Sequence, residues 1–326
     1  MDNFRWGIMG TGGIAKAFAK DLQLAPGHVV AAVGSRSLTT AEEFASPYPG
    51  CTPHGSYESL VNDPNVDAIY IATLNPYHSP NALLAISAGK PVLCEKPFAL
   101  NAREASEMIE AARKSNLALV EAMWTRFLPH IHQLRKILSS GVLGEIICVE
   151  ADHGQALEER NIPRLALLEN GGGGLIDLGV YPISFAHLVL GAPKKISASA
   201  LFSNEGVDSQ TSAIFDYESG AQAIVSSNMR GRTPCRAVIS GTLARVEIDR
   251  TFYRPTTMRV VTKDEVVTEY PNNYEGHGLR EQAIEFARVV RAGEMESPLL
   301  TWDETLAVMN SMDEIRKIIG LKYPME

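Results

Sequence analysis

Short apolar runs alternate with helix-like stretches along the first third of the chain. The apolar runs occupy residues 6–9, 29–33, 68–72, 92–94 and 117–120. Because these runs lack a regular polar alternation, they are typical of strands buried on both faces of a sheet. The stretches between them have the apolar spacing of helices, at residues 14–24, 40–45, 81–88 and 102–114. This alternation predicts βαβ units and a doubly wound parallel sheet.

The pattern changes after Ala122, where longer strand-like segments joined by turns replace the alternation. Residues 211–231 turn at 218–220 and residues 257–270 turn at 263–264, so we expect two antiparallel hairpins. Amphipathic helices are expected near the end of the chain, over 279–292 and 305–319. The fold class is therefore predicted to be α/β, with two domains. Residues 1–122 would hold the parallel sheet, and residues 123–326 an α+β domain with a large, mainly antiparallel sheet.

Composition and charge narrow the classes of partner. A formal net charge of −8 and the lack of a basic run give no support to nucleic-acid binding. The four cysteines are widely spaced and form no CxxC pair, which favours reduced thiols in a cytosolic protein. The N-terminus lacks the features of a secretory signal, and no apolar run is expected to approach the roughly 20 residues of a membrane span. We therefore expect a cytoplasmic protein without a membrane partner.

A glycine-rich turn follows the first expected strand. Gly10, Gly12 and Ala15 have the spacing GxGxxA and open the first expected helix. Glycines in this position let the backbone approach a pyrophosphate, whose charge lies at the helix N-terminus. The turn predicts that residues 1–122 form a dinucleotide-binding Rossmann domain, in which Gly10, Thr11, Gly12, Gly13 and Ile14 contact the cofactor.

The end of the second expected strand bears on the choice of dinucleotide. NAD-binding domains usually carry an acidic residue there for the ribose 2′-hydroxyl. This chain instead has Ser35, Arg36 and Ser37, which suit a 2′-phosphate and favour NADP. The alternative is an ordinary exposed arginine in a loop, and use of NAD as well as NADP stays open.

Two polar positions stand out against apolar surroundings. Glu95, Lys96 and Pro97 end the strand at 92–94, at the sheet edge where parallel sheets bind ligands. Asp177 and Tyr181 are four residues apart after the glycines at 171–174, so near a helix start they would share one face. The alternative is a simple N-cap at Asp177 and a core aromatic at Tyr181.

Four ordered motifs together resemble one known family. They are GTGGIA at 10–15, EKP at 95–97, EAMWTRFLP at 121–129 and GGGGLIDLGVYP at 171–182. The chain is similar to the Gfo/Idh/MocA oxidoreductases, and within them to the branch of dimeric dihydrodiol dehydrogenase and glucose-fructose oxidoreductase. The resemblance covers nearly the whole chain.

The resemblance implies roles for the residues of these motifs. Lys96 would hydrogen-bond the reacting oxygen, Glu95 would lie near the nicotinamide ribose, and Tyr181 would be the general acid/base. Asp177 would help to position substrate or lysine. Many family members have a histidine in place of Tyr181, which points away from the inositol-dehydrogenase branch.

Further residues are assigned to the cofactor and substrate pockets by the same resemblance. Thr73, Asn75 and His78 match a turn close to the cofactor, and Trp124 and Arg126 match a segment lining the substrate pocket. His153, at a strand end, is a candidate for the substrate pocket, with simple solvation as the alternative.

The chemistry of a dehydrogenase requires these residue types. As hydride leaves a carbinol carbon, the hydroxyl loses a proton to an acid/base that touches it. A tyrosine, with a pKa near 10, needs a nearby cation such as lysine to favour the phenolate. We expect an NADP-preferring oxidoreductase acting on a sugar, anhydro-sugar or cyclic trans-dihydrodiol, without a metal. The alternative function is a non-catalytic sensor that binds dinucleotide and sugar. A homodimer through the C-terminal sheet is also expected from the resemblance.

Overall fold

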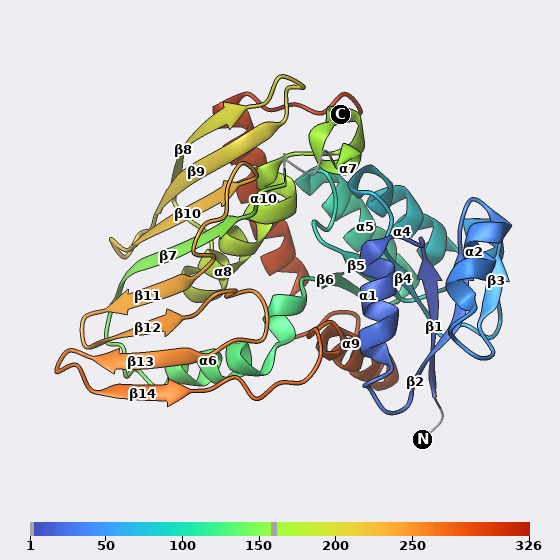
Figure 1. Cartoon of the computed structure of the whole chain (residues 1–326), viewed down its shortest axis with the longest axis horizontal. Helices are drawn as coiled ribbons and strands as arrows, with labels where there is room; N and C mark the ends of the chain where they lie inside the picture. Colours follow the sequence, from blue (N-terminus) through green and yellow to red (C-terminus); the bar gives the residue numbers. More distant parts are fainter. Residues whose placement is uncertain (1–2, 158–161) are drawn as a thin grey trace. The chain divides into compact units, whose positions relative to one another are not determined.

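A computed structural model describes residues 3–157 and 162–326. The chain divides into two compact units (Figure 1). The first comprises Met1–Phe127 and Glu275–Thr305, and the second comprises Leu128–Tyr274 and Leu306–Glu326. The domain boundary expected after residue 122 stays a prediction, since the compact units are interleaved along the chain.

The first unit is built on a six-stranded sheet in the order β3-β2-β1-β4-β5-β6, with every pair parallel. The strands are β1 (Phe4–Met9), β2 (His28–Gly34), β3 (Thr52–His54), β4 (Ala68–Ile71), β5 (Val92–Glu95) and β6 (Leu119–Ala122). The helices are α1 (Gly13–Leu22), α2 (Leu38–Ala45), α3 (Tyr57–Val61), α4 (His78–Ser87), α5 (Ala102–Ser115) and α9 (Arg280–Ala292), with short 3₁₀ turns η1 (Asn75–Tyr77) and η2 (Trp124–Phe127). The strand order reverses between β1 and β4, and sheets of this type bind ligands at the carboxyl ends of the strands that flank such a switch point.

Aromatic side chains fill the core around the central strands of this sheet. Trp6, Phe18 and Tyr70 are each fully buried, and the rings of Phe18 and Tyr70 stack at 3.8 Å. Phe286 of α9 lies against Trp6, with ring centroids 5.6 Å apart. Asp21 of α1 also accepts the backbone N–H groups of His277, Gly278 and Arg280 at 2.7–3.0 Å. These contacts explain why α9, far along the sequence, belongs to the first unit.

The second unit is built on an eight-stranded sheet in the order β14-β13-β12-β11-β7-β10-β9-β8. Its strands are β7 (Ile146–Gly154), β8 (Lys195–Phe202), β9 (Asp208–Asp216), β10 (Gln222–Asn228), β11 (Ala237–Gly241), β12 (Ala244–Ile248), β13 (Met258–Thr262) and β14 (Val267–Tyr270). Only β7 and β10 pair in parallel, and the other pairs are antiparallel. Its helical segments are α6 (Pro129–Ser139), α7 (Pro163–Ala166), η4 (Leu168–Asn170), η5 (Leu175–Gly179), α8 (Val180–Leu190) and most of α10 (Trp302–Ile319).

One face of this sheet is covered and the other is exposed. Burial alternates along β9 and β10, and α8 packs against β7 and β10 (Figure 1). On the opposite face, Ile214 and Ile224 are cross-strand neighbours and each is 43% exposed. Leu201, opposite Gln210 of β9, is exposed on the same face.

The predicted fold class is confirmed: a doubly wound parallel sheet is joined to a mainly antiparallel one. Both predicted hairpins are present, as β9–β10 and β13–β14. The prediction missed β3 and α3, which are only three and five residues long. Elements this short carry too few residues to show a period.

One helical stretch of the described residues, Leu168–Leu190, has the length and apolar composition of a membrane span. The expectation that no apolar run approaches that length therefore did not foresee this segment. Its most apolar window is 83% buried within the structure, as in a core helix.

Candidate active site

The glycine turn after β1 has the geometry of a dinucleotide-binding turn. Gly10 has φ +105°, and a Cβ there would lie 2.8 Å from the carbonyl oxygen of Ala72, so no other residue fits. Gly12 is the N-cap of α1 and supplies no side-chain cap, which leaves the first N–H groups of the helix available to an anion. A Cβ at Gly12 or Gly13 would meet no atom of the protein. Packing does not require glycine at these two positions, whereas close approach of a phosphate does.

The end of β2 presents a cation and hydroxyl groups. Arg36 is exposed, Ser35 is buried, and the Ser35 hydroxyl accepts the Ser37 N–H at 3.5 Å. The side chains of residues 35–37 include no carboxylate.

His78 links two turns at the carboxyl edge of the parallel sheet. Its Nδ1 lies 2.8 Å from the carbonyl oxygen of Pro97, and its Nε2 lies 3.2 Å from that of Thr73. The ring is 1% exposed, and burial lowers the pKa of His78 to about 4. Both ring nitrogens therefore face backbone carbonyls. These contacts join the turns after β4 and β5, and the cofactor contact expected of His78 stays a prediction. Asn75, also assigned to the cofactor, is buried in η1.

The turn after β5 carries Lys96. Glu95, at 4% exposure, accepts the Tyr70 hydroxyl at 2.5 Å through Oε1 and the Lys96 N–H at 3.2 Å through Oε2. The Lys96 side chain is partly exposed at the strand end, and the Lys96–Pro97 peptide bond is cis. Glu95 therefore joins Tyr70 of β4 to the backbone of the turn after β5. Its position near the nicotinamide ribose stays a prediction.

Glu121, on the neighbouring strand β6, is a buried carboxyl group that sequence reasoning did not single out. It is 3% exposed, and its Oε2 accepts the Thr305 hydroxyl at 3.2 Å. Burial raises the pKa of Glu121 to about 7, against the effect of this hydrogen bond and of the Arg126 cation; the Glu95 charge raises it further. Glu121 thus ties β6 to the start of α10.

Trp124 and Arg126, predicted to line a substrate pocket, are both buried in the first unit. The Trp124 ring stacks on His277 at 5.1 Å, and Arg126 Nη1 donates to Glu304 Oε1 at 3.0 Å. Arg126 is 1% exposed, and burial lowers the pKa of its guanidinium. Its described contacts are structural, and pocket lining by either residue stays a prediction.

In the second unit, Asp177 and Tyr181 lie on the helical stretch that begins after the glycines. The segment η5 is a π-helix that passes directly into α8. Pro182 lacks an N–H and therefore interrupts the helical hydrogen-bond ladder close to this junction. Both side chains are 7% exposed. Arg164 of α7 donates to both oxygens of Asp177 at 3.1 and 3.4 Å, a bidentate ion pair.

Tyr181 belongs to a cluster of three aromatic rings. Its ring lies 5.2 Å from that of His153 and 4.6 Å from that of Tyr253, and His153 and Tyr253 are 4.1 Å apart. Gln155 Nε2 lies 2.8 Å from His153 Nε2 and donates to the Tyr253 hydroxyl at 3.2 Å. Since His153 Nδ1 lies 3.2 Å from the Leu178 carbonyl oxygen, Nδ1 is the donor and Nε2 accepts from Gln155. The structure thus brings His153 next to Tyr181.

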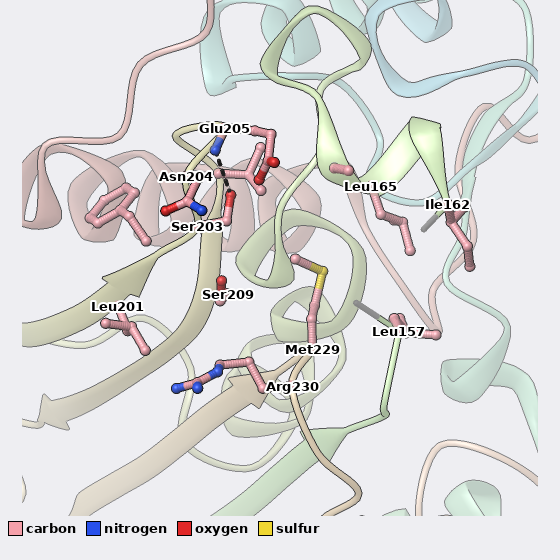
Figure 2. Close-up of a pocket in the computed structure, with 13 residues that line it drawn as sticks. Leu157, Ile162, Leu165, Leu201, Ser203, Asn204, Glu205, Ser209, Met229 and Arg230 are labelled. Atoms are coloured by element: carbon pink, nitrogen blue, oxygen red, sulfur yellow. Dashed lines mark hydrogen bonds between the residues drawn. The ribbon is translucent and has the colours of Figure 1, made fainter. Parts of the chain in front are cut away.

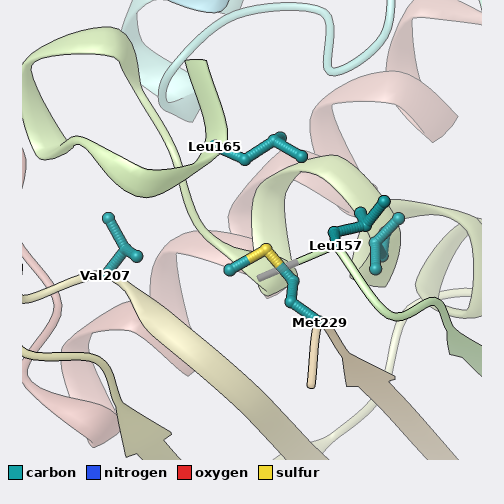
Figure 3. Close-up of a cluster of buried hydrophobic side chains, with 5 residues drawn as sticks. Leu157, Leu165, Val207 and Met229 are labelled. Carbon is teal, nitrogen blue, oxygen red and sulfur yellow. The ribbon is translucent and has the colours of Figure 1, made fainter. Parts of the chain in front are cut away.

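A pocket of about 550 Å³ lies in the same unit (Figure 2). Leu157, Ile162, Leu165 and Met229 line one side, and the turn at 203–205 lines another, where the Ser203 hydroxyl accepts the Glu205 N–H at 3.2 Å. Around Met229, a buried cluster gathers Leu157, Leu165, Leu178 and Val207 (Figure 3). Leu178 directly follows Asp177 in the chain, so the cluster supports the stretch that carries Asp177 and Tyr181.

Sequence reasoning missed Tyr253, Gln155 and Glu121. Tyr253 and Gln155 lie in loops outside any periodic segment, where no local pattern indicates what they contact. Among residues 3–157 and 162–326, no group of three or more His, Cys, Asp or Glu side chains is arranged to hold a metal ion.

Comparison with known proteins gives the same class. A family described as "Oxidoreductase family, NAD-binding Rossmann fold" matches residues 4–122, and the "GFO/IDH/MocA C-terminal domain" matches residues 131–247. The chain is 36% identical over 334 residues to the trans-1,2-dihydrobenzene-1,2-diol dehydrogenase of Mus musculus, which covers 99% of this chain and 98% of that protein. The enzyme of the same name from Sus scrofa is also 36% identical, over 335 residues, with the same coverage.

Solved structures are similar over almost the whole chain. A 3-ketoreductase from Actinomadura kijaniata in complex with NADP and TDP-benzene superimposes with a TM-score of 0.87 at 26% identity, covering 98% of each chain. An aldose-aldose oxidoreductase from Caulobacter crescentus has a TM-score of 0.87 at 23% identity and 98% coverage of each chain, which shows a shared fold.

The sheet order, the glycine turn and the second sheet define a two-domain oxidoreductase with an NAD-binding Rossmann fold. The chain belongs to the Gfo/Idh/MocA family. The predicted family and the predicted class of NAD(P)-dependent oxidoreductase are confirmed.

Glu121→Gln tests the raised pKa of the buried carboxyl group on β6. With a folded-state pKa of about 7 against 4.5 for the free group, the folded protein holds a proton that the unfolded chain has lost across this pH range. Glu121 therefore makes the wild type less stable as pH rises from 4.5 to 7, by about 3 kcal/mol in free energy of unfolding. The variant lacks this loss. In urea unfolding, its free energy of unfolding should therefore rise relative to that of the wild type between pH 4.5 and 8. If the free energies of unfolding of the two proteins changed in parallel with pH, the raised pKa of Glu121 would be contradicted.

Proposed function

We propose that the protein is an NADP-preferring oxidoreductase that transfers hydride between the nicotinamide and a CH–OH or C=O carbon. The substrate would be a sugar, an anhydro-sugar or a cyclic trans-dihydrodiol. The observation that carries the proposal is the pairing of the Gly10 turn with Lys96, both at the carboxyl edge of the parallel sheet of a family oxidoreductase.

The glycine turn supports dinucleotide binding. The open N-terminus of α1 and the constraint at Gly10 fit a pyrophosphate, which the exposed glycines Gly12 and Gly13 would let approach the backbone. Thr11 and Ile14 flank these glycines and would contact the same group. The cofactor supplies the hydride acceptor or donor when bound.

The loop after β2 supports the preference for NADP. Arg36 and the serines beside it can bind a 2′-phosphate through charge-assisted hydrogen bonds, and no carboxylate there would repel it. The 3-ketoreductase from Actinomadura kijaniata was solved with NADP. NAD as a second cofactor remains part of the proposal.

We assign the proton to Lys96 and Tyr181. The phenol of Tyr181 would take the proton of the substrate hydroxyl during oxidation and return it during reduction. The Lys96 ammonium would stabilise the phenolate and the developing alkoxide. Asp177 would orient substrate hydroxyls through the oxygens that Arg164 holds in place. His153, in ring contact with Tyr181, would keep that phenol in one rotamer. Two further structures of the ketoreductase are of variants in which a lysine or a tyrosine is substituted, which are the two residue types assigned here.

The substrate class rests on the relatives and on the leucine-rich surroundings of Asp177. Relatives that match nearly the full length are named for a cyclic trans-diol. A ring with an apolar face and vicinal hydroxyls would suit a carboxylate beside the buried cluster around Met229. Trp124 and Arg126 stay candidates for the pocket wall.

We further propose that the protein is cytoplasmic and forms a homodimer through its eight-stranded sheet. The exposed face of that sheet presents Leu201, Ile214 and Ile224, and such an apolar area is typical of a covered interface.

Tyr181→Phe tests the acid/base assignment. Loss of the hydroxyl removes proton transfer, so kcat for NADP⁺ reduction should fall by roughly 10²- to 10⁴-fold while the cofactor Kd changes little. Tyr217→Phe is the matched control, since Tyr217 is also buried in this unit and its hydroxyl has no partner among the described residues. Equal activity of the Tyr181 variant and the wild type would show that another group handles the proton.

Arg36→Ala tests the cofactor preference. Removing a charged donor to the 2′-phosphate should weaken NADP binding by roughly 10- to 100-fold and leave NAD binding within a factor of about 2. Arg103→Ala on α5, a similarly exposed arginine, is the control. Kd values from quenching of intrinsic fluorescence check this result, and an equal change for both cofactors would contradict the proposed contact.

Ile214→Lys tests the dimer. A charge on an apolar interface should shift the protein toward monomer in sedimentation velocity. Leu24→Lys, in the first unit and 46% exposed, should leave the dimer intact. A wild type that sediments as a monomer at all concentrations would rule out the homodimer.

A further inference from the structure

Close packing of the backbone requires glycine at two of the four positions 171–174, independently of the proposed chemistry. Gly173 has φ +123°, and a Cβ there would lie 2.3 Å from Asp208 Oδ1. A Cβ at Gly172 would lie 2.5 Å from the Leu165 carbonyl oxygen. The backbone therefore passes too close to Asp208 and to α7 for any side chain at these two positions.

Asp208, at the start of β9, hydrogen-bonds to the first turn of the helical stretch that carries Asp177 and Tyr181. Its Oδ2 accepts the Leu175 N–H at 2.7 Å and the Thr211 hydroxyl at 2.7 Å. The side chain is fully buried. The first N–H groups of a helix have no partner within the helix, and the helix dipole makes this end positive. A carboxylate from a distant strand thus serves as the N-terminal cap of η5 and α8.

The C-terminal tail holds the same glycines from another side. The Tyr323 hydroxyl donates to the Gly172 carbonyl oxygen at 2.8 Å, and Tyr323 is 3% exposed. Arg316 lies 4.8 Å over the Tyr323 ring and pairs with Glu326. Among the described residues, Arg316 of α10 and Tyr323 and Glu326 of the tail are the titratable or charged groups on this side of the glycines. Thr211 of β9 donates to Asp208.

We infer that Asp208 is a positioning residue: it fixes the start of the helical stretch so that Asp177 and Tyr181 face the substrate in one geometry. The inference rests on the proposed roles of those two residues. Leu175 is two residues before Asp177 and six before Tyr181, within a single helical stretch. Movement of its first turn therefore moves both side chains, and misplacement of a catalytic group by about 1 Å costs up to roughly 100-fold in rate.

The ionisation of Asp208 offers a specific readout. Burial raises the pKa of Asp208 to about 6 against the effect of its hydrogen bonds. Below that pH a proton occupies one of the oxygens, and the carboxyl group accepts the Leu175 N–H less strongly. The wild-type kcat should therefore decline in mildly acidic solution, through a step that an uncharged residue at this position removes.

Asp208→Asn in the full-length protein tests the inference, with Asp216→Asn as the matched control on the same strand. Asp216 accepts a hydrogen bond from Gln222 at the sheet surface and does not contact the glycines. Hydrogen exchange over residues 171–181, NADP⁺ Kd and the pH profile of kcat are measured for each protein. Thr211→Val, which removes a single donor to Oδ2, provides a milder variant if the Asn protein does not fold.

We expect faster exchange over 171–181, a kcat reduced roughly 10- to 100-fold, an NADP⁺ Kd within a factor of about 2 and no acid step near pH 6 in the Asn variant. Thr211→Val should shift exchange and kcat in the same direction by several-fold, and Asp216→Asn should match the wild type. Unchanged exchange over 171–181, or faster exchange with an unchanged kcat, overturns the inference. A wild type without turnover on any substrate contradicts the proposed function instead, and exchange then decides whether Asp208 holds the helix.

Discussion

The turn after β5 depends on buried polar groups that hold it from several sides. Tyr70 and the Lys96 N–H share the Glu95 carboxylate, and His78 faces the Pro97 carbonyl. A buried donor or acceptor that loses its partner costs about 1–3 kcal/mol, so these contacts strongly favour one path for the chain. The position of Lys96 follows from that path, and the proposed chemistry follows from Lys96.

In the second unit, a different set of contacts fixes the path of the backbone. There a helical stretch must begin at one place, because Asp177 and Tyr181 lie within its first two turns. Gly172 and Gly173 let the backbone approach α7 and Asp208 closely. Asp208 accepts the Leu175 N–H, and the Tyr323 hydroxyl donates to the Gly172 carbonyl oxygen. In both units, buried side chains hold the backbone, and the backbone in turn presents the residues proposed for chemistry.

Sequence patterns predicted the architecture because it depends on local spacing. The strands of the parallel sheet, the glycine turn and the two hairpins each leave a periodic or positional signal within a few residues. Glu121, Asp208 and Tyr253 leave no such signal, because their partners lie far along the chain or in loops. Arg126 and His78 show the opposite difficulty. Both lie in motifs of the resembled family, yet a motif does not reveal that Arg126 pairs with Glu304 or that His78 faces two carbonyl groups.

The most direct test of the account follows the hydride itself. A trans-dihydrodiol or aldose deuterated at its carbinol carbon is incubated with the protein and NADP⁺, and the reduced cofactor is analysed by mass spectrometry. The account predicts NADPH that carries the deuterium at C4 of the nicotinamide ring. Tight binding of NADP⁺ without reduction by any aldose, inositol or cyclic diol would contradict it, and would favour a dinucleotide-binding sensor with the same fold.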